Sequence, residues 1–218
     1  MAFETLKNNR YFLLPGVVLF LFLSVILLGY SKASIHLWLN NYHSDFFDWF
    51  FRYITNLGDG LFIIIPVVVL LFFSLRNALF VLSVYLSTGL ITQLVKRLLF
   101  DGAERPIRYF HDIAHLHLVE GVKMLSGHSF PSGHATSAFA LFLCLALLFK
   151  NRWIQLACFI TACLVAYSRI YLSQHFLIDV YAGSLIGITG ALLFYPVFYG
   201  GKDRIWHRWS FQNLFRHD

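Results

Sequence analysis

A short stretch near the end of the chain holds three ionisable side chains in otherwise apolar surroundings. It reads Ser168-Arg169-Ile170-Tyr171-Leu172-Ser173-Gln174-His175-Phe176-Leu177-Ile178-Asp179. Ionisable groups are costly at membrane depth, so in such a stretch they usually mark a functional site. His175 and Asp179 are four residues apart, a spacing that places both side chains on one face of a helix. A carboxylate in that position can hold one ring nitrogen of His175 and leave the other nitrogen free for chemistry.

A second group of candidate residues lies in the polar stretch 96–134. It contains Lys96, then Arg105 followed by proline, and it ends on Ser129-Phe130-Pro131-Ser132-Gly133-His134. Proline and serine before an apolar run are helix-start signals, and the free N–H groups of a helix start form an anion site. Lys96, Arg105 and Arg169 add cations, and arginine makes paired hydrogen bonds to phosphate oxygens. With two histidines, this set has the groups that phosphoryl transfer needs without a metal.

The elements that position these residues are membrane helices. The chain is 58% hydrophobic and only 13% charged, whereas soluble domains average about 25% charged residues. The apolar residues form long blocks, which indicates an integral membrane protein. The formal charge of +6 fits basic residues that flank spans and attract anionic lipid, and no basic and aromatic stripe predicts nucleic-acid binding. The three cysteines lie in apolar segments and are expected to serve packing.

Six hydrophobic segments predict an all-α fold, a six-helix transmembrane bundle that occupies the whole chain, 1–218, as one domain. The segments are residues 11–29, 61–75, 78–95, 135–149, 153–172 and 177–199. The second and the fourth are shorter than the about 20 residues that a span needs. Short basic turns favour a cytoplasmic N-terminus and C-terminus. With that topology, the active-site loop 96–134 and the turn 173–176 fall on the same, outer face of the membrane.

The first outer loop, residues 36–60, contains a very aromatic stretch that is too polar to span. It reads Phe46-Phe47-Asp48-Trp49-Phe50-Phe51-Arg52-Tyr53. Such a pattern predicts an amphipathic helix in the membrane interface. Two roles are open for this helix: anchoring the protein, or lining a lateral entrance for a lipid substrate.

At these motifs the chain resembles the type 2 phosphatidic acid phosphatases, integral membrane lipid phosphatases that share their site with vanadium haloperoxidases. Pro131-Ser132-Gly133-His134 is the second piece of the family pattern, and Ser168-Arg169, five residues, His175, three residues and Asp179 is the third. The first piece is usually a lysine, six residues and then Arg-Pro. Here eight residues separate Lys96 from Arg105, and seven would follow Arg97. The loop must therefore bulge by two residues to bring Lys96 to the site.

The resemblance implies a role for each motif residue. His175 would attack phosphorus and form a phosphohistidine, Asp179 would hold its ring, and His134 would protonate the leaving oxygen and later activate water. The phosphate and its developing charge would be bound by Lys96, Arg105, Ser132, Gly133 and Arg169. The resemblance implies no metal and no other cofactor. The residues by themselves leave open which histidine is the nucleophile, and whether Ser168 touches phosphate or bridges structure.

The function expected from the resemblance is metal-independent hydrolysis of a membrane lipid phosphate or diphosphate. In bacteria the family's substrates include undecaprenyl diphosphate, phosphatidylglycerophosphate, phosphatidic acid and lipid A phosphates. The short inner loops of the chain resemble those of a bacterial protein, so a bacterial inner membrane with the site facing the periplasm or outside is expected. Two alternatives stay open: a phosphotransferase that passes phosphate to another lipid, and a non-catalytic lipid phosphate carrier. A haloperoxidase is disfavoured by the membrane spans. The oligomeric state stays open as well.

The 96–134 loop carries further histidines. His111 and His115 are four residues apart, which can bind zinc on a helix, but no glutamate follows His111 as in zinc proteases. Surface positions near the headgroups are therefore expected for them and for His117. His128 lies six residues before His134 and is a candidate for assisting substrate binding.

Overall fold

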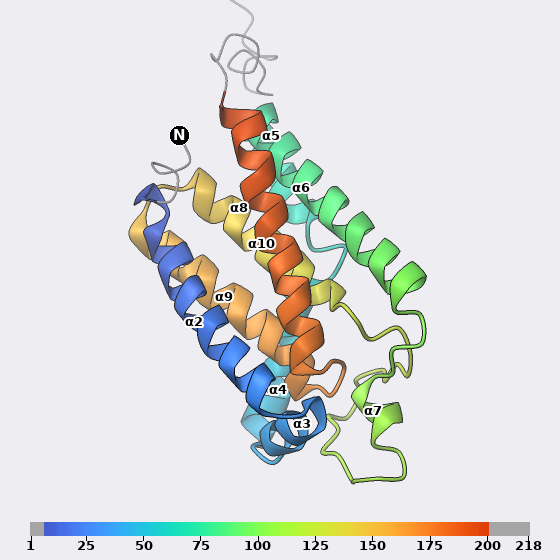
Figure 1. Cartoon of the computed structure of the whole chain (residues 1–218). Helices are drawn as coiled ribbons and strands as arrows, with labels where there is room; N and C mark the ends of the chain where they lie inside the picture. Colours follow the sequence, from blue (N-terminus) through green and yellow to red (C-terminus); the bar gives the residue numbers. More distant parts are fainter. Residues whose placement is uncertain (1–6, 201–218) are drawn as a thin grey trace, which may run out of the picture.

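The computed structural model describes residues 7–200, and this part of the chain is helical without a strand. The predicted all-α fold is therefore confirmed (Figure 1). Its elements are α2 (Arg10–Gly29), α3 (Lys32–Asn40), α4 (Asp45–Ile54), the short helix η1 (Thr55–Gly58), α5 (Ile64–Phe73), α6 (Leu75–Leu94), the π turn η2 (Val95–Leu99), α7 (Pro106–Tyr109), α8 (Gly133–Leu148), α9 (Arg152–Tyr171) and α10 (Leu177–Tyr199).

Four of these helices are long and apolar enough to cross a membrane: α2, α6 with its π turn, α9 and α10. The helices α5 and α8 are apolar but shorter, with 10 and 16 residues. They correspond to the two predicted segments that fall short of a full span. Large apolar side chains on the outward faces, such as Leu21, Val25 and Leu28 of α2, are exposed, as expected of helices whose surroundings are lipid.

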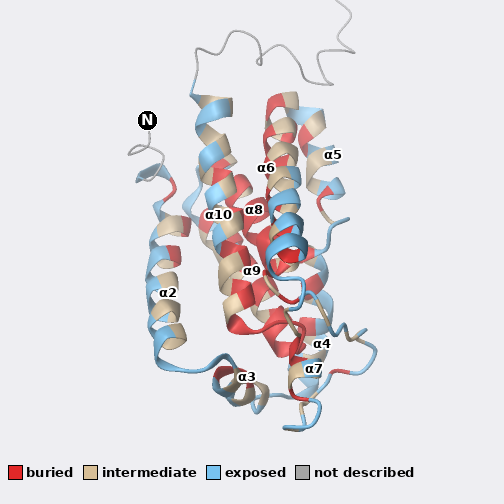
Figure 2. Cartoon of the chain, turned by 45° about the vertical axis from the view of Figure 1, so that its right-hand side comes forward, coloured by how far each residue is buried: buried red, intermediate tan, exposed pale blue. Residues whose placement is uncertain are grey.

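The core of the bundle forms around α8, which packs against α6, α9 and α10 and is largely buried (Figure 2). Small residues of α10 permit the close approach of the two helices. A Cβ added at Gly183 would lie 2.3 Å from the carbonyl oxygen of Ser132, and one at Gly187 would lie 2.5 Å from that of Thr136. Small residues four apart bring membrane helices together in this way. This packing fixes the start of α8 against the first turns of α10.

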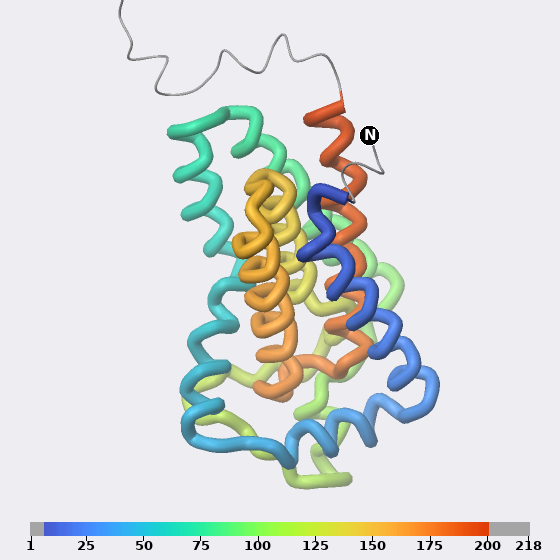
Figure 3. Tube along the Cα trace, turned by 90° about the vertical axis from the view of Figure 1, so that its left-hand side faces the viewer, coloured from blue at the N-terminus to red at the C-terminus, as the bar shows by residue number. Residues whose placement is uncertain are grey.

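The helices α3 and α4 and the short helix η1 lie across one end of the bundle, beside the end of α9 (Figure 3). We refer to residues 32–58 as the connecting segment. The predicted aromatic helix is α4, which Ser44 caps by accepting a hydrogen bond from the Phe47 N–H. Its Phe51 is buried against Tyr167 and Tyr171 of α9, whereas Trp49 is exposed. One face of α4 is thus held by the bundle and the other is free to meet a membrane interface.

Candidate active site

The turn between α9 and α10 carries His175 and differs from the prediction. His175 lies before α10, not within a helix, so the expected shared helix face is wrong. The backbone N–H groups of Gln174 and His175 both donate to the carbonyl oxygen of Arg169, which folds the turn back on α9. Asp179, in the first turn of α10, accepts a hydrogen bond from the Phe176 N–H at 3.0 Å. The pair forms because this capping contact points the carboxylate back at the turn.

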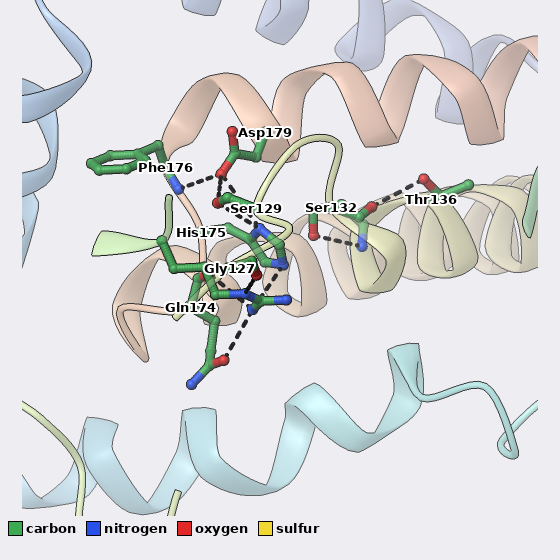
Figure 4. Close-up of polar contacts among 10 residues, drawn as sticks. Gly127, Ser129, Ser132, Thr136, Gln174, His175, Phe176 and Asp179 are labelled. Atoms are coloured by element: carbon green, nitrogen blue, oxygen red, sulfur yellow. Dashed lines mark hydrogen bonds and ion pairs between the residues drawn. The ribbon is translucent and has the colours of Figure 1, made fainter. Parts of the chain in front are cut away.

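Both ring nitrogens of His175 have a partner (Figure 4). Nδ1 lies 3.4 Å from Oδ2 of Asp179, and Nε2 lies 3.4 Å from Nη1 of Arg105. Because the carboxylate only accepts and the guanidinium has no acceptor, this pattern assigns the proton to Nδ1 and the lone pair to Nε2. Burial, followed by the positive charges of Arg105, Arg169 and Lys96, lowers the pKa of His175 well below its ordinary value. The ring is therefore neutral at neutral pH, which is the form that can act as a nucleophile.

Ser129 also binds the carboxylate of Asp179. Its hydroxyl donates to Oδ2 at 2.5 Å and lies 3.5 Å from Nδ1 of His175 (Figure 4). The Ser129 backbone is fixed by a hydrogen bond from its N–H to the carbonyl oxygen of Ala103. Loop 96–134 thereby reaches the His175–Asp179 pair directly. The predicted meeting of this loop with the turn before α10 is confirmed.

Arg105 is held by the backbone at two points. Its Nε donates to the carbonyl oxygen of Gly127 at 2.9 Å, and its Nη1 donates to the carbonyl and side-chain oxygens of Gln174 at 3.1 and 3.2 Å. Gln174 in turn donates through Nε2 to the carbonyl oxygen of Lys123. These contacts fix the guanidinium plane, and among the described residues Nη2 has no hydrogen-bond partner, so its donors are available to an anion.

The structure distinguishes the two candidate lysine and arginine positions at the start of the loop. Lys96 lies in the π turn Val95–Leu99 and is 8% exposed, whereas Arg97 is exposed. Lys96 interacts electrostatically with Arg105, Arg169 and Asp179. Since a π turn is a local widening of a helix, it supplies the kind of bulge that the long spacing to Arg105 requires.

Arg169 approaches from the end of α9. Its Nη1 donates to Oγ1 of Thr55 at 2.7 Å, and its Nε is buried without a hydrogen-bond partner among the described residues. The neighbouring Ser168 donates its hydroxyl to the carbonyl oxygen of Val165 at 2.6 Å and is fully buried. The Ser168 hydroxyl proton is therefore used within α9.

The start of α8 completes the site. The Ser132 hydroxyl caps the helix by accepting from the Ala135 N–H, and the Ser132 N–H donates to the carbonyl oxygen of Asp179 at 2.9 Å. A Cβ added at Gly133 would meet no atom within 4 Å, so the space in front of the first turn is open. His134 interacts electrostatically with Arg169 and His175. The free N–H groups of this helix start therefore face the same region as the cations.

The charge of this region is unbalanced. Lys96, Arg105 and Arg169 are 8%, 6% and 8% exposed, and Asp179 is the buried acid beside them. Across residues 7–200, none of these three cations forms an ion pair with a carboxylate. Buried charges are costly unless they are compensated. An anion with two negative charges, such as a phosphate monoester, would compensate them.

The other histidines of the loop lie outside this region. His111 contacts Asp112, His117 contacts Asp48, and His128 contacts Asp101 at 3.1 Å. Within residues 7–200, no three His, Cys, Asp or Glu side chains are arranged to hold a metal ion. His128 is 55% exposed and its aspartate partner 72%, so the pair sits at the surface.

Three contacts of the site involve residues to which no role was assigned from sequence: Ser129, Gln174 and Thr55. Their partners Asp179, Arg105 and Arg169 lie 50, 69 and 114 residues away along the chain. No spacing rule links residues so far apart. For Ser129 a signal exists, because it is the first residue of the stretch Ser129-Phe130-Pro131-Ser132-Gly133-His134 that leads into the helix start.

Comparison with known proteins identifies the class. Residues 77–202, more than half of the chain, match the family model described as the PAP2 superfamily. The chain belongs to the PAP2 superfamily and is a membrane lipid phosphate phosphatase. It is 31% identical to the lipid A 4'-phosphatase of Bacteroides thetaiotaomicron over 168 residues, which is 75% of each chain. It is 36% identical to the lipid A 1-phosphatase of Rhizobium johnstonii over 116 residues, or 51% of this chain and 43% of that protein.

Two solved structures share the fold. The structure of Aquifex aeolicus LpxE superposes with a TM-score of 0.68 and 25% identity, covering 76% of this chain and 96% of that one. The PAP2-type phosphatidylglycerolphosphate phosphatase of Bacillus subtilis superposes with a TM-score of 0.64 and 24% identity, covering 91% of this chain and 98% of that one. Both are consistent with a transmembrane PAP2 fold for this integral membrane protein.

Proposed function

We propose that this protein hydrolyses a lipid phosphate at the outer face of a membrane, without a metal, through a phosphohistidine on His175. In this proposal α5 and α8 join the four long helices in a six-helix transmembrane bundle, and α4 lies in the interface. The chain acts as a single catalytic domain. A bacterial inner membrane with the site facing the periplasm fits the bacterial relatives.

The first step transfers the phosphoryl group to the protein. The Nε2 lone pair of His175 forms a bond to phosphorus while the bond from phosphorus to the lipid oxygen breaks. The negative charge of the bound phosphate favours the protonated form of His134, which gives its proton to that departing oxygen, so that the lipid leaves as an alcohol. Asp179 stabilises the positive charge that develops on the His175 ring by accepting the hydrogen bond from Nδ1.

The second step returns the protein to its starting state. His134, now neutral, takes a proton from water, whose oxygen attacks the phosphohistidine. The bond between Nε2 and phosphorus breaks, and inorganic phosphate leaves. Throughout both steps the charge on the equatorial oxygens would be stabilised by Lys96, Arg105, Arg169 and the N–H groups that follow Ser132 and Gly133.

One observation carries this proposal: the two nitrogens of a buried, neutral His175 face a carboxylate on one side and an arginine on the other. The arrangement gives a nucleophilic lone pair at the point where cations lacking carboxylate partners converge. A carrier that only holds a headgroup has no use for the His175–Asp179 pair.

For the substrate, we propose the phosphate monoester of a lipid A-type glycolipid as the first candidate, because two relatives that match 75% and 79% of this chain are lipid A 4'-phosphatases. Phosphatidylglycerophosphate is the second candidate, because the Bacillus subtilis protein that shares the fold is named as a phosphatidylglycerolphosphate phosphatase. The exposed aromatic face of α4 would line the route of the lipid into the site.

The test is release of inorganic phosphate by the purified full-length protein from a panel of lipid phosphates. The panel contains lipid A, phosphatidylglycerophosphate, phosphatidic acid and undecaprenyl diphosphate in detergent, each without an acceptor lipid. Release from at least one of them supports hydrolysis. Phosphate that appears only on an added acceptor lipid would instead identify a phosphotransferase, and binding without any release would identify a carrier.

A further inference from the structure

The side chain of Arg169 is anchored from outside the family motifs. Its Nη1 donates to Oγ1 of Thr55 at 2.7 Å, and both residues are buried, 8% exposed each. The family match begins at residue 77, so Thr55 lies before it. The Nε of the same guanidinium is buried and has no hydrogen-bond partner among the described residues. A buried donor of this kind is costly unless a ligand accepts from it.

The short helix η1, which begins at Thr55, is itself fixed against the site. A Cβ added at Gly58 would lie 2.7 Å from Cγ1 of Val165, and 3.0 Å from the carbonyl oxygen of His134. Glycine is thus required for η1 to reach both α8 and α9. Through Gly58 η1 lies against the backbone of His134, and through Thr55 it bonds to the side chain of Arg169, so it links the start of α8 to the end of α9.

Other residues of the connecting segment hold the turn that carries His175. Ser173 has a backbone φ of +50°, a left-handed conformation that is unfavourable for serine, and it is fully buried. Its hydroxyl is contacted by Nδ2 of Asn40 at 3.3 Å and by Nε2 of His36 at 3.2 Å. Burial lowers the pKa of His36 to about 4, so this contact is made by a neutral ring at neutral pH.

From these contacts we infer that Thr55 is a positioning residue for phosphoryl transfer, which fixes the guanidinium of Arg169 so that its free Nε points at a phosphate oxygen. A guanidinium is planar and its five donors are rigidly related, so one hydrogen bond at Nη1 sets the direction of the others. The connecting segment then completes the site in addition to meeting the lipid. The inference rests on the proposed function for the identity of the substrate, whereas the contact between Thr55 and Arg169 does not depend on that proposal.

The decisive variant is Thr55→Val, which keeps the shape and removes the hydroxyl. Thr88→Val is the matched control, since Thr88 is also buried, at 1% exposed, and its hydroxyl donates only within its own helix. We expect Thr55→Val to lower kcat about 10-fold to 100-fold with little change in KM, because the three phosphate oxygens need Arg169 most in the transition state. The inhibition constant of orthovanadate, which mimics that state, should rise by a similar factor.

Rescue by Thr55→Ser separates positioning from packing. Serine restores the hydroxyl and lacks the methyl group, so it should keep kcat and the orthovanadate inhibition constant within about threefold of the wild type. Thr88→Val should leave both quantities unchanged. Wild-type kcat and orthovanadate affinity in Thr55→Val would overturn the inference, and so would a loss in Thr55→Ser equal to that in Thr55→Val.

A double-mutant cycle keeps the test independent of folding defects. Thr55→Val should add little to the loss already caused by Arg169→Lys if Thr55 acts through Arg169, whereas multiplied losses overturn the inference. Binding of orthovanadate alone can be measured as a shift of the protein's melting temperature, and this measurement needs no lipid. A wild type that binds orthovanadate but releases no phosphate from any lipid would contradict the proposed function and leave the Thr55 test intact.

Discussion

The two halves of the candidate phosphate site are built differently. The half that runs from Ser168 to Asp179 is the end of α9, a tight turn and the start of α10, held by backbone hydrogen bonds to the carbonyl oxygen of Arg169. The other half, from Lys96 to His134, is a π turn followed by a long loop, held by single contacts such as Arg105 Nε to Gly127 and Ser129 N–H to Ala103. The first half is formed mainly by two helix ends and their turn. The second half also contacts the first, through Arg105 to Gln174 and Ser129 to Asp179, so substitutions in the two halves should have different effects.

The largest effect is expected from the regular half, at His175. His175→Ala removes the proposed nucleophile and should lower phosphate release about 10⁴-fold or more. Orthovanadate should still raise the melting temperature of this variant, because the cations remain. Phosphate release is measured on the best lipid of the panel. Near-normal turnover by a folded His175→Ala protein would refute the phosphohistidine.

The next effect is at Arg105, where the loop half meets the ring of His175. Arg105→Gln should lower kcat/KM about 10²-fold to 10³-fold, the usual cost of losing a donor to transition-state charge. The pH profile of this variant shows in which direction the charge of Arg105 shifts the pKa of His175. Burial and then the charge of Arg105 lower the pKa of His175, so removing that charge raises it and moves the acid limb of kcat/KM to higher pH.

Arg108→Gln is the control for the Arg105 experiment. Arg108 is 62% exposed and pairs with Glu104 at 3.0 Å, away from His175. Its pH profile should overlay that of the wild type. An acid limb that stays in place in Arg105→Gln would show that Arg105 does not act on the His175 ring.

A smaller effect tests which basic residue at the start of the loop, Lys96 or Arg97, reaches the phosphate. Lys96→Met should lower kcat/KM about 10-fold to 100-fold, since it removes one of several charges that stabilise the transferred phosphoryl group. Arg97→Met should leave it unchanged, because Arg97 is exposed on the next position of the same π turn. Steady-state kinetics of the two variants side by side is the measurement. A greater loss in Arg97→Met would mean that Arg97, and not Lys96, stabilises the phosphoryl group.

The smallest effect is expected at Ser129, where the loop half supports the regular half. Ser129→Ala removes one of the hydrogen bonds to Oδ2 of Asp179 and leaves those from Phe176 and His175. Loss of one such bond corresponds to about a tenfold fall in kcat. Ser129→Thr retains the hydroxyl and should retain most of kcat. Full activity in Ser129→Ala would show that the regular half positions Asp179 without the loop.

The positions of the membrane helices could be predicted from the sequence, because long apolar runs determine where these helices form. The apolar runs locate α2, α6, α8, α9 and α10 to within a few residues, because each run is continuous and long. The contact between His175 and Asp179 was predicted correctly, but the local structure that brings the two side chains together was not. The spacing indicated a helix face, whereas the structure uses a turn and a helix cap, since Asp179 satisfies the free N–H of Phe176.

The amino-acid sequence alone was enough to show a helical membrane protein and to single out the ionisable residues proposed for its site, because cations and histidines among apolar helices are costly without a function. Its motifs also indicated the lipid phosphatase family. The packed structure was needed to see that Lys96 is buried and Arg97 is exposed, and that Ser129, Gln174 and Thr55 bond to the candidate residues Asp179, Arg105 and Arg169. The reason is physical: local pattern fixes where helices form, whereas hydrogen bonds between residues far apart in the chain exist only after the helices have packed.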